Sequence, residues 1–353
     1  MEPPFTNLLA GLVLLVFMLL NQSWFMGAFF LISGYFTPGS FDRKGPGSFL
    51  KDRLLRLGIP LVVFIFVLSP IAWTGLWQMP ASITGITNPL TWQSYSKLVS
   101  IGPLGPMWFI AMLLIFDFGY AAWRMATRNR VSHPAINSVP PGYLAIGTFI
   151  LVLALASYLI RMVVPLGKDI LNLPTIAYLP QYLSLFVLGT VASRHNWFQA
   201  LSSSKGLVGF GTALVTGVFL FPLAISGRLF SLELTAALTN SLGNGHWQSA
   251  IYTLWDSTFA VGLCLGIITL FRHLFNGQGR FGRFLSQHSY TVFVIHIPIL
   301  VYLAVSLRGI SFEHLLKFGM VFPNQSSTAK KERVKRQRHL HFLVREKGRV
   351  TPK

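Results

Sequence analysis

The chain has 353 residues, of which 52% are hydrophobic and only 11% are charged, and its mean hydropathy is +0.56. Soluble globular domains carry about 25% charged residues, so this composition excludes an ordinary soluble protein and indicates a chain embedded in a bilayer. The formal net charge of +19 overstates the charge of the apolar part, because ten basic residues against two acidic ones lie between Lys330 and Lys353.

Long apolar stretches follow one another along the chain and predict membrane-spanning helices, each of which needs about 20 residues. Upstream, the apolar stretch 7–36 is interrupted at Asn21, Gln22 and Ser23. One long tilted helix and a re-entrant piece followed by a short span both remain open there. The further predicted spans cover residues 57–77, 107–123, 143–164, 176–192, 207–225, 249–271 and 290–307. The predicted fold class is therefore all-α, a polytopic transmembrane helix bundle with about eight or nine spans.

Basic residues alternate between the segments that connect these spans. The segments rich in basic residues carry Arg43, Lys44, Lys51, Arg53 and Arg56, then Arg124, Arg128 and Arg130, then Arg194 and Lys205, then Arg272, Arg280 and Arg283. The intervening segments carry only Lys97, Lys168, Arg228 and Arg308. By the positive-inside rule we expect a multi-pass integral protein of the cell or inner membrane, with its arginine-rich loops in the cytoplasm.

Two arginines stand three residues apart just before the span that begins at residue 57. The positive-inside rule accounts for any arginine in this loop, but not for the spacing of Arg53 and Arg56. On a helix this spacing places both side chains on one face, where two guanidinium forks make a good clamp for an anion. The phosphates of a nucleotide-like cytoplasmic ligand and lipid headgroups both fit such a clamp.

Ionisable residues inside membrane spans are candidates for function. His296 lies in the middle of its span, with Pro298 close by, and is either catalytic or a packed neutral side chain that positions other groups. Arg161 lies near the outer end of its span, where it either extends to the surface or binds an acidic acyl group or the acceptor. Asp117 and Asp256 either pair with an arginine or histidine of another helix or orient a base.

The first apolar stretch contains the tripeptide Ser33–Gly34–Tyr35, in which a small polar, a minimal and an aromatic residue follow one another. Gly34 allows a close approach of another helix, and Ser33 and Tyr35 either line the path of a donor or simply pack. The histidines show no ligand spacing, so we predict no metal site and no cofactor. Glycine-rich phosphate loops and a Ser-His-Asp order are also not visible in the sequence.

Four motifs together resemble a known family. The first is "FFLISGYF" followed by "KDRLLRLGIP", an Arg-x-x-Arg motif. The others are "GPMWFIAMLLIFDFGYAAWR", "LPQYLSLFVLGTVASRHNW" and "FLSQHSYTVFVIHIPILVYL", in this order. The chain is similar, over about residues 24–316, to the acyltransferase-3 family of integral membrane O-acyltransferases, and most similar to the branch that includes glucan biosynthesis protein C.

The resemblance implies a mechanism. An acyl-CoA donor, which is a substrate and not a cofactor, approaches from the cytoplasm and has its phosphates held by the pair Arg53 and Arg56. Its acyl group passes to a hydroxyl of a sugar or glycan acceptor, with a family histidine on the first helix as general base. We therefore expect donor binding at Arg53, Arg56, Ser33 and Tyr35. Catalytic roles are expected at His296, Asp117 and Arg161.

The chain departs from the family pattern at both ends. No histidine precedes His133, so we expect the family's first helix to be missing, and after Phe322 the sequence turns into a stretch that cannot span a membrane. This leaves open whether the chain as written is active. We expect an acyltransferase-3-like domain over residues 1–322 and a basic, disordered tail over 323–353.

The partners expected are membrane lipids, the donor and the acceptor. Nucleic acid is not expected, although a basic tail is also typical of proteins that bind it or anionic lipid. The alternative function is a multi-pass transporter or flippase-like carrier without acyl transfer chemistry. Inverted repeats with paired broken helices would indicate such a carrier, and none is visible in the sequence.

Overall fold

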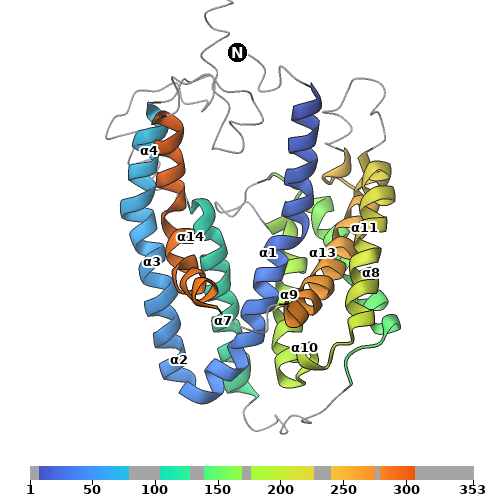
Figure 1. The fold of residues 1–353 in the computed structure, drawn as a ribbon, viewed down its shortest axis with the longest axis horizontal. Helices are drawn as coiled ribbons and strands as arrows, with labels where there is room; N and C mark the ends of the chain where they lie inside the picture. The colour runs from blue at the N-terminus through green and yellow to red at the C-terminus, as the bar shows by residue number, and fades with distance from the viewer. Residues whose placement is uncertain are drawn as a thin grey trace, which may run out of the picture. The chain divides into compact units, whose positions relative to one another are not determined.

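The computed structural model describes residues 8–78, 104–127, 139–168, 176–225, 240–274 and 279–306. These residues are almost entirely helical and contain no strand (Figure 1). Eight helical segments within them are long and apolar enough to cross a membrane. The prediction of an all-α polytopic bundle is therefore confirmed for the described residues.

The helices follow the predicted order. They are α1 (Leu8–Lys44), α2 (Pro46–Arg53), α3 (Ile59–Val63), α4 (Ser69–Trp77), α7 (Trp108–Ala126), α8 (Tyr143–Val163), α9 (Leu179–Arg194), α10 (Trp197–Ala200), α11 (Ser203–Ile225), α13 (Trp247–Leu274) and α14 (Arg280–Ser306). Two π-helical turns, η1 (Leu54–Gly58) and η2 (Phe64–Leu68), join α2, α3 and α4 into one continuous span.

The first apolar stretch forms one long helix, α1, and not a re-entrant piece followed by a second span. Its polar interruption is satisfied inside the bundle. The hydroxyl of Ser23 donates to the carbonyl of Leu20, and the amide of Gln181 donates to the carbonyl of Ser23 at 2.6 Å. Because these polar groups have partners, the helix continues through them without a break.

The expected loop before residue 57 is instead nearly all helix, and this prediction was wrong. α1 continues to Lys44 and α2 begins at Pro46, so Gly45 alone makes the turn. Gly45 has φ of 74°, a conformation that glycine adopts without steric cost, and proline is well suited to the first turn of a helix. Arg53 and Arg56 therefore lie within a helical span rather than in a loop ahead of it.

The chain divides into two compact units, and the larger one contains 19–64 and 104–289. Within it, α1 crosses α9 at two glycines. A Cβ on Gly34 would overlap the carbonyl oxygen of Phe186, and one on Gly189 would overlap the carbonyl of Leu31. The prediction that Gly34 allows a close helix approach is thus confirmed. In the same unit α13 packs along α11 and against α8.

The smaller unit contains 1–18, 65–103 and 290–353. Its described helices include α4 and the second half of α14, which run side by side (Figure 1). A Cβ on Gly75 would lie 2.6 Å from a methyl of Val301, and the hydroxyls of Thr74 and Tyr302 are hydrogen-bonded at 2.9 Å. The predicted basic tail lies outside the described residues.

Candidate active site

Three helices of the larger unit bring Thr37, Arg53 and Asp117 together. Arg53 Nε lies 3.1 Å from Asp117 Oδ2, the Thr37 hydroxyl is 3.0 Å from Asp117 Oδ1, and Arg53 Nη2 donates to Thr37 Oγ1 at 3.4 Å. The Arg53 N–H is not aligned on the carboxylate, so this contact is an ion pair and not a hydrogen bond. Of the two alternatives for Asp117, the ion pair with a cation from another helix is present.

Burial makes this cluster rigid. Thr37 and Asp117 are fully buried, whereas the Arg53 side chain remains 20% exposed and lies over the ring of Phe49 at 5.1 Å. A buried carboxylate is tolerated only when it is paired, so Asp117 holds the guanidinium of Arg53 in a defined place. The exposed part of that guanidinium stays accessible for a ligand.

Arg56 is far more exposed than Arg53 and pairs with a different carboxylate. Its side chain is 72% exposed, and its Nε lies 2.8 Å from Asp52 Oδ1, while Asp52 Oδ2 accepts a hydrogen bond from Lys44 at 2.7 Å. Arg53 and Arg56 thus differ in exposure and in acidic partner, and their joint action as an anion clamp stays a prediction. The π-helical turn η1 follows Arg53, and in it the N–H of Ile59 reaches back five residues to Leu54. A π-turn contains more residues than an α-helical turn, so the angle between side chains three residues apart is larger there than in a regular α-helix.

A second ionic cluster, which the sequence analysis did not predict, joins the ends of α1, α7 and α9. Asp42 pairs with Arg194 at 2.6 Å and with Arg124 at 3.2 Å. Arg194 also donates to the hydroxyl of Tyr120 at 3.0 Å, and the Tyr120 ring packs edge-on against Phe41. Only the alternation of basic residues hinted at this cluster, because it showed that these helix ends lie at the same membrane surface.

Positive charge exceeds negative charge at this end of the larger unit. The ends of α1, α2, α7 and α9, together with η1, carry the seven basic residues Arg43, Lys44, Lys51, Arg53, Arg56, Arg124 and Arg194. The acidic residues are Asp42 and Asp52 at these ends and Asp117, which contacts Arg53 from the middle of α7. An excess of four positive charges around a partly exposed guanidinium favours an anionic ligand.

Arg161 lies deeper in the larger unit than expected. Its side chain is fully buried, Nη2 lies 2.6 Å from Asp256 Oδ2, and Nε donates to the carbonyl of Ala177. The rings of Tyr178 and Tyr252 lie 4.8 Å and 5.7 Å from its guanidinium carbon. The interpretation that Arg161 extends to the surface was wrong, and the expected pairing of Asp256 with a cation is confirmed.

His296 lies on the part of α14 that belongs to the smaller unit. Its Nδ1 lies 2.6 Å from the carbonyl oxygen of Phe293. A carbonyl only accepts, so Nδ1 carries the proton and Nε2 of the neutral ring keeps its lone pair. The side chain is partly buried and can act as a base through Nε2.

Ser33 and Tyr35 have local packing roles in the structure. The backbone carbonyl of Ser33 accepts a hydrogen bond from Thr37, and the ring of Tyr35 stacks on Phe198 with centroids 4.5 Å apart and planes 10° from parallel. The sequence analysis did not select Thr37. Its position four residues after Ser33, on the same face of α1, was the available signal.

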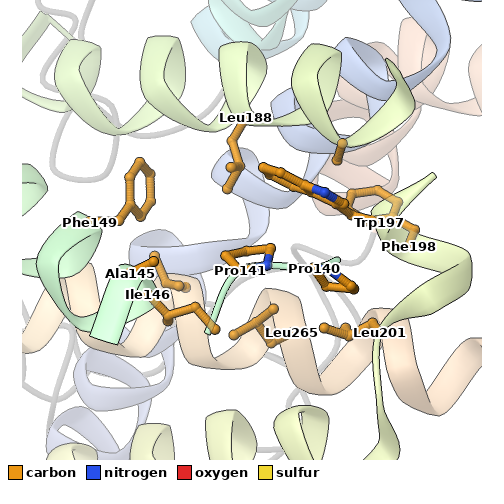
Figure 2. A pocket seen from close by; sticks show the side chains of 12 residues that line it. Pro140, Pro141, Ala145, Ile146, Phe149, Leu188, Trp197, Phe198, Leu201 and Leu265 are labelled. Carbon is orange, nitrogen blue, oxygen red and sulfur yellow. The ribbon is translucent and has the colours of Figure 1, made fainter. Parts of the chain in front are cut away.

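An apolar pocket lies beside α8, α9, α10 and α13 (Figure 2). Its volume is about 150 Å³. The residues that line it are Pro140, Pro141, Ala145, Ile146, Phe149, Leu188, Ala192, Trp197, Phe198, Leu201, Val261 and Leu265. It has no chemical group for catalysis, so it is not part of the ionic clusters described above.

Comparisons with known proteins support one family. The chain gave no match among the curated proteins and none among the solved structures. A family model described as an acyltransferase domain, Acyl_transf_3, matches residues 3–323. Because this match covers most of a chain that also has eight candidate membrane-spanning helices, the protein belongs to the acyltransferase-3 family and is an integral membrane acyltransferase.

Proposed function

We propose that this acyltransferase moves an acyl group from an acyl-CoA to a hydroxyl of a sugar or glycan. The observation that supports a CoA donor best is the fixed, partly exposed guanidinium of Arg53 at the basic end of the larger unit. A CoA thioester carries several phosphate charges, and planar guanidinium groups bind phosphate through paired hydrogen bonds. The sugar acceptor is inferred from the branch that the motifs resemble.

In this proposal the two arginines have different tasks. Arg53 keeps Nε and Nη2 towards Asp117 and Thr37 and offers Nη1 to a phosphate. Arg56 is more exposed and exchanges its contact with Asp52 for a second phosphate oxygen. Asp117 positions Arg53 rather than moving a proton, and Ser33 and Tyr35 support the α1 face behind this site.

The chemical step needs a base. His296 is our candidate for this base, because its Nε2 keeps a lone pair while Nδ1 contacts the carbonyl of Phe293. The base takes the proton of the acceptor hydroxyl as the hydroxyl oxygen attacks the thioester carbonyl carbon, the carbon–sulfur bond breaks, and the departing thiolate receives that proton. Arg161 keeps its contact with Asp256 inside the larger unit, and its expected role in binding the acceptor or an acidic acyl group stays a prediction.

The arginine-rich helix ends face the cytoplasm in this proposal, because acyl-CoA is made there and because basic residues favour that side. A carrier without chemistry is the less favoured function, since the family match is to an acyltransferase domain. Such a carrier would bind its cargo but would not split a thioester.

The test is to measure donor binding and thiol release separately. The purified chain is placed in liposomes with an acyl-CoA, with and without a sugar acceptor, and free thiol is followed by a chromogenic reagent. Cys264 is the only cysteine and is buried, so the protein contributes little background. We expect saturable donor binding and thiol release that depends on the acceptor. Absence of donor binding by a folded, inserted chain would refute the proposal.

A further inference from the structure

The apolar pocket is suited to hydrocarbon. Of the twelve side chains that line it, only that of Trp197 contains a polar atom, and Figure 2 shows the rings of Trp197 and Phe198 beside Leu188 at one wall. Water needs two to four polar partners, and dry apolar cavities of about 150 Å³ take up benzene-sized molecules. In a helix bundle surrounded by bilayer, the abundant apolar molecule is a lipid chain.

Two cations are attached to the pocket wall itself. Lys205 Nζ donates to the carbonyls of Pro140 and Pro141 at 3.2 Å and 2.8 Å. Arg272 Nη1 donates to the carbonyls of Phe198 and Gln199 at 3.2 Å and 2.7 Å. Three of these four carbonyls belong to residues that line the pocket. Both charges therefore lie at the edge of the apolar space.

No carboxylate neutralises this edge within the described residues. From 139 to 274 the only acidic residue that the structure describes is Asp256, which is buried against Arg161. Lys205 lies near the start of α11, and Arg272 lies near the end of α13. The start of one helix and the end of the next antiparallel one lie at the same membrane surface, where lipid headgroups are.

We propose that this pocket binds an anionic phospholipid, with a segment of one acyl chain in the pocket and the phosphate at Lys205 and Arg272. Basic pockets between membrane helices are suited to anionic headgroups. The free energy of binding has two sources, which are apolar burial in the pocket and charge attraction at its edge.

The acyl chain of the donor is not the occupant. Tyr35 stacks on Phe198 at the pocket wall, whereas Thr37 contacts Arg53. Tyr35 and Thr37 are two residues apart on α1, which corresponds to a rotation of about 200° around the helix axis. Their side chains therefore lie on nearly opposite sides of α1, with the pocket on one side and the Arg53 cluster on the other. This placement favours a membrane lipid over the acyl chain of the donor as the occupant.

The test uses Trp197, which lines the pocket, as the reporter. The full chain is reconstituted with phospholipids that carry bromine atoms on their acyl chains, which quench tryptophan fluorescence on contact. Subtracting the spectrum of Trp197→Phe isolates the signal of Trp197. We expect this signal to be quenched more by brominated phosphatidylglycerol than by brominated phosphatidylcholine at equal mole fraction.

Two matched pairs of variants distinguish lipid binding in the pocket from general contact between the protein and the bilayer. Ala145→Phe fills the pocket, whereas Leu144→Phe adds the same ring at a neighbouring position that is 86% exposed and does not line it. Lys205→Gln removes a charge at the pocket but keeps an N–H donor for the proline carbonyls, whereas Lys168→Gln removes one elsewhere. Ala145→Phe should abolish the preference for phosphatidylglycerol, and Lys205→Gln should lower it about fivefold.

Three results would each overturn the proposal. The first is equal quenching of Trp197 by both lipids. The second is an equal effect of Ala145→Phe and Leu144→Phe, or of Lys205→Gln and Lys168→Gln. The third is displacement of the brominated phosphatidylglycerol by an equal amount of free fatty acid, which would show that the pocket binds a hydrocarbon chain without a phosphate.

Discussion

Arg161 and Asp256 form an ion pair that is completely enclosed by the larger unit. Nη2 and Oδ2 are 2.6 Å apart, and the two side chains are 0% and 1% exposed. Both residues lie on helices that could span the membrane, α8 and α13, so neither charge reaches bulk water. Two consequences follow for stability, because removing one partner leaves the other as an uncompensated buried charge.

Asp256→Asn should destabilise the protein by about 3–5 kcal/mol, because it leaves the guanidinium of Arg161 without its counter-charge. The measurement is unfolding in detergent with increasing denaturant. The double variant Arg161→Met with Asp256→Leu removes both charges and should recover most of this loss. Equal stability of Asp256→Asn and the unmodified chain would contradict the buried pair.

Arg56→Ala should weaken acyl-CoA binding about tenfold without affecting folding, because the side chain is exposed and a charge-assisted contact to phosphate contributes about 1.5–3 kcal/mol. Calorimetry on the detergent-solubilised protein measures it. Arg56→Lys should recover only part of the affinity, since an ammonium group does not form the fork. Lys51→Ala is the matched control on the same helix, and an equal loss there would show a general charge effect.

Arg53→Ala should lower both donor affinity and stability, unlike Arg56→Ala, because it leaves Asp117 buried without its cation. Arg53→Ala combined with Asp117→Ala should regain stability but not donor binding. Donor binding by this folded double variant at the original affinity would exclude Arg53 from the donor site.

The variant His296→Asn distinguishes the roles of the two imidazole nitrogens. The asparagine amide can still donate to the carbonyl of Phe293 in place of Nδ1, but it has no equivalent of the basic Nε2. We expect a fall of roughly 10²–10⁴-fold in acyl transfer, with unchanged donor binding and melting temperature. If the variant keeps its activity, His296 is not the base, and a loss of folding would make its role structural.

Gly34→Ala should destabilise the larger unit by about 1–3 kcal/mol, because the added methyl overlaps the carbonyl of Phe186 and forces α1 away from α9. Gly39→Ala, five residues on in the same helix, is the matched control. No atom lies within 4 Å of a Cβ at that position, so alanine there should be neutral or stabilising by up to about 1 kcal/mol. Similar melting temperatures for the two variants would contradict the close helix crossing.

The proposed orientation places the turn between α1 and α2 in the cytoplasm. A cysteine introduced at Gly47, which is exposed, should not react with an impermeant thiol reagent in intact cells but should react after permeabilisation. The native Cys264 is buried and serves as the unreactive control. Labelling of intact cells would reverse the orientation of the whole chain.

The sequence by itself determined the order of the membrane helices in the described residues, and left open only whether the first apolar stretch forms one span or two segments. A bilayer requires about 20 apolar residues per span, and this requirement can be read from any single segment. The need of Asp117 and Asp256 for cationic partners was also visible, because an isolated charge in hydrocarbon is too costly. The close approach of another helix at Gly34 could also be predicted, because glycine has no side chain.

Only the tertiary structure decided which cation each acid meets. Arg53 and Asp117 lie on different helices, α2 and α7, and Arg161 and Asp256 are 95 residues apart in sequence. Local patterns do not specify contacts over such separations, so neither of the two alternatives for Arg161 included its burial against Asp256. The different burial of Arg53 and Arg56 was likewise not visible in their spacing, because it depends on Asp117, which lies on another helix and pairs with Arg53, whereas Arg56 pairs with Asp52.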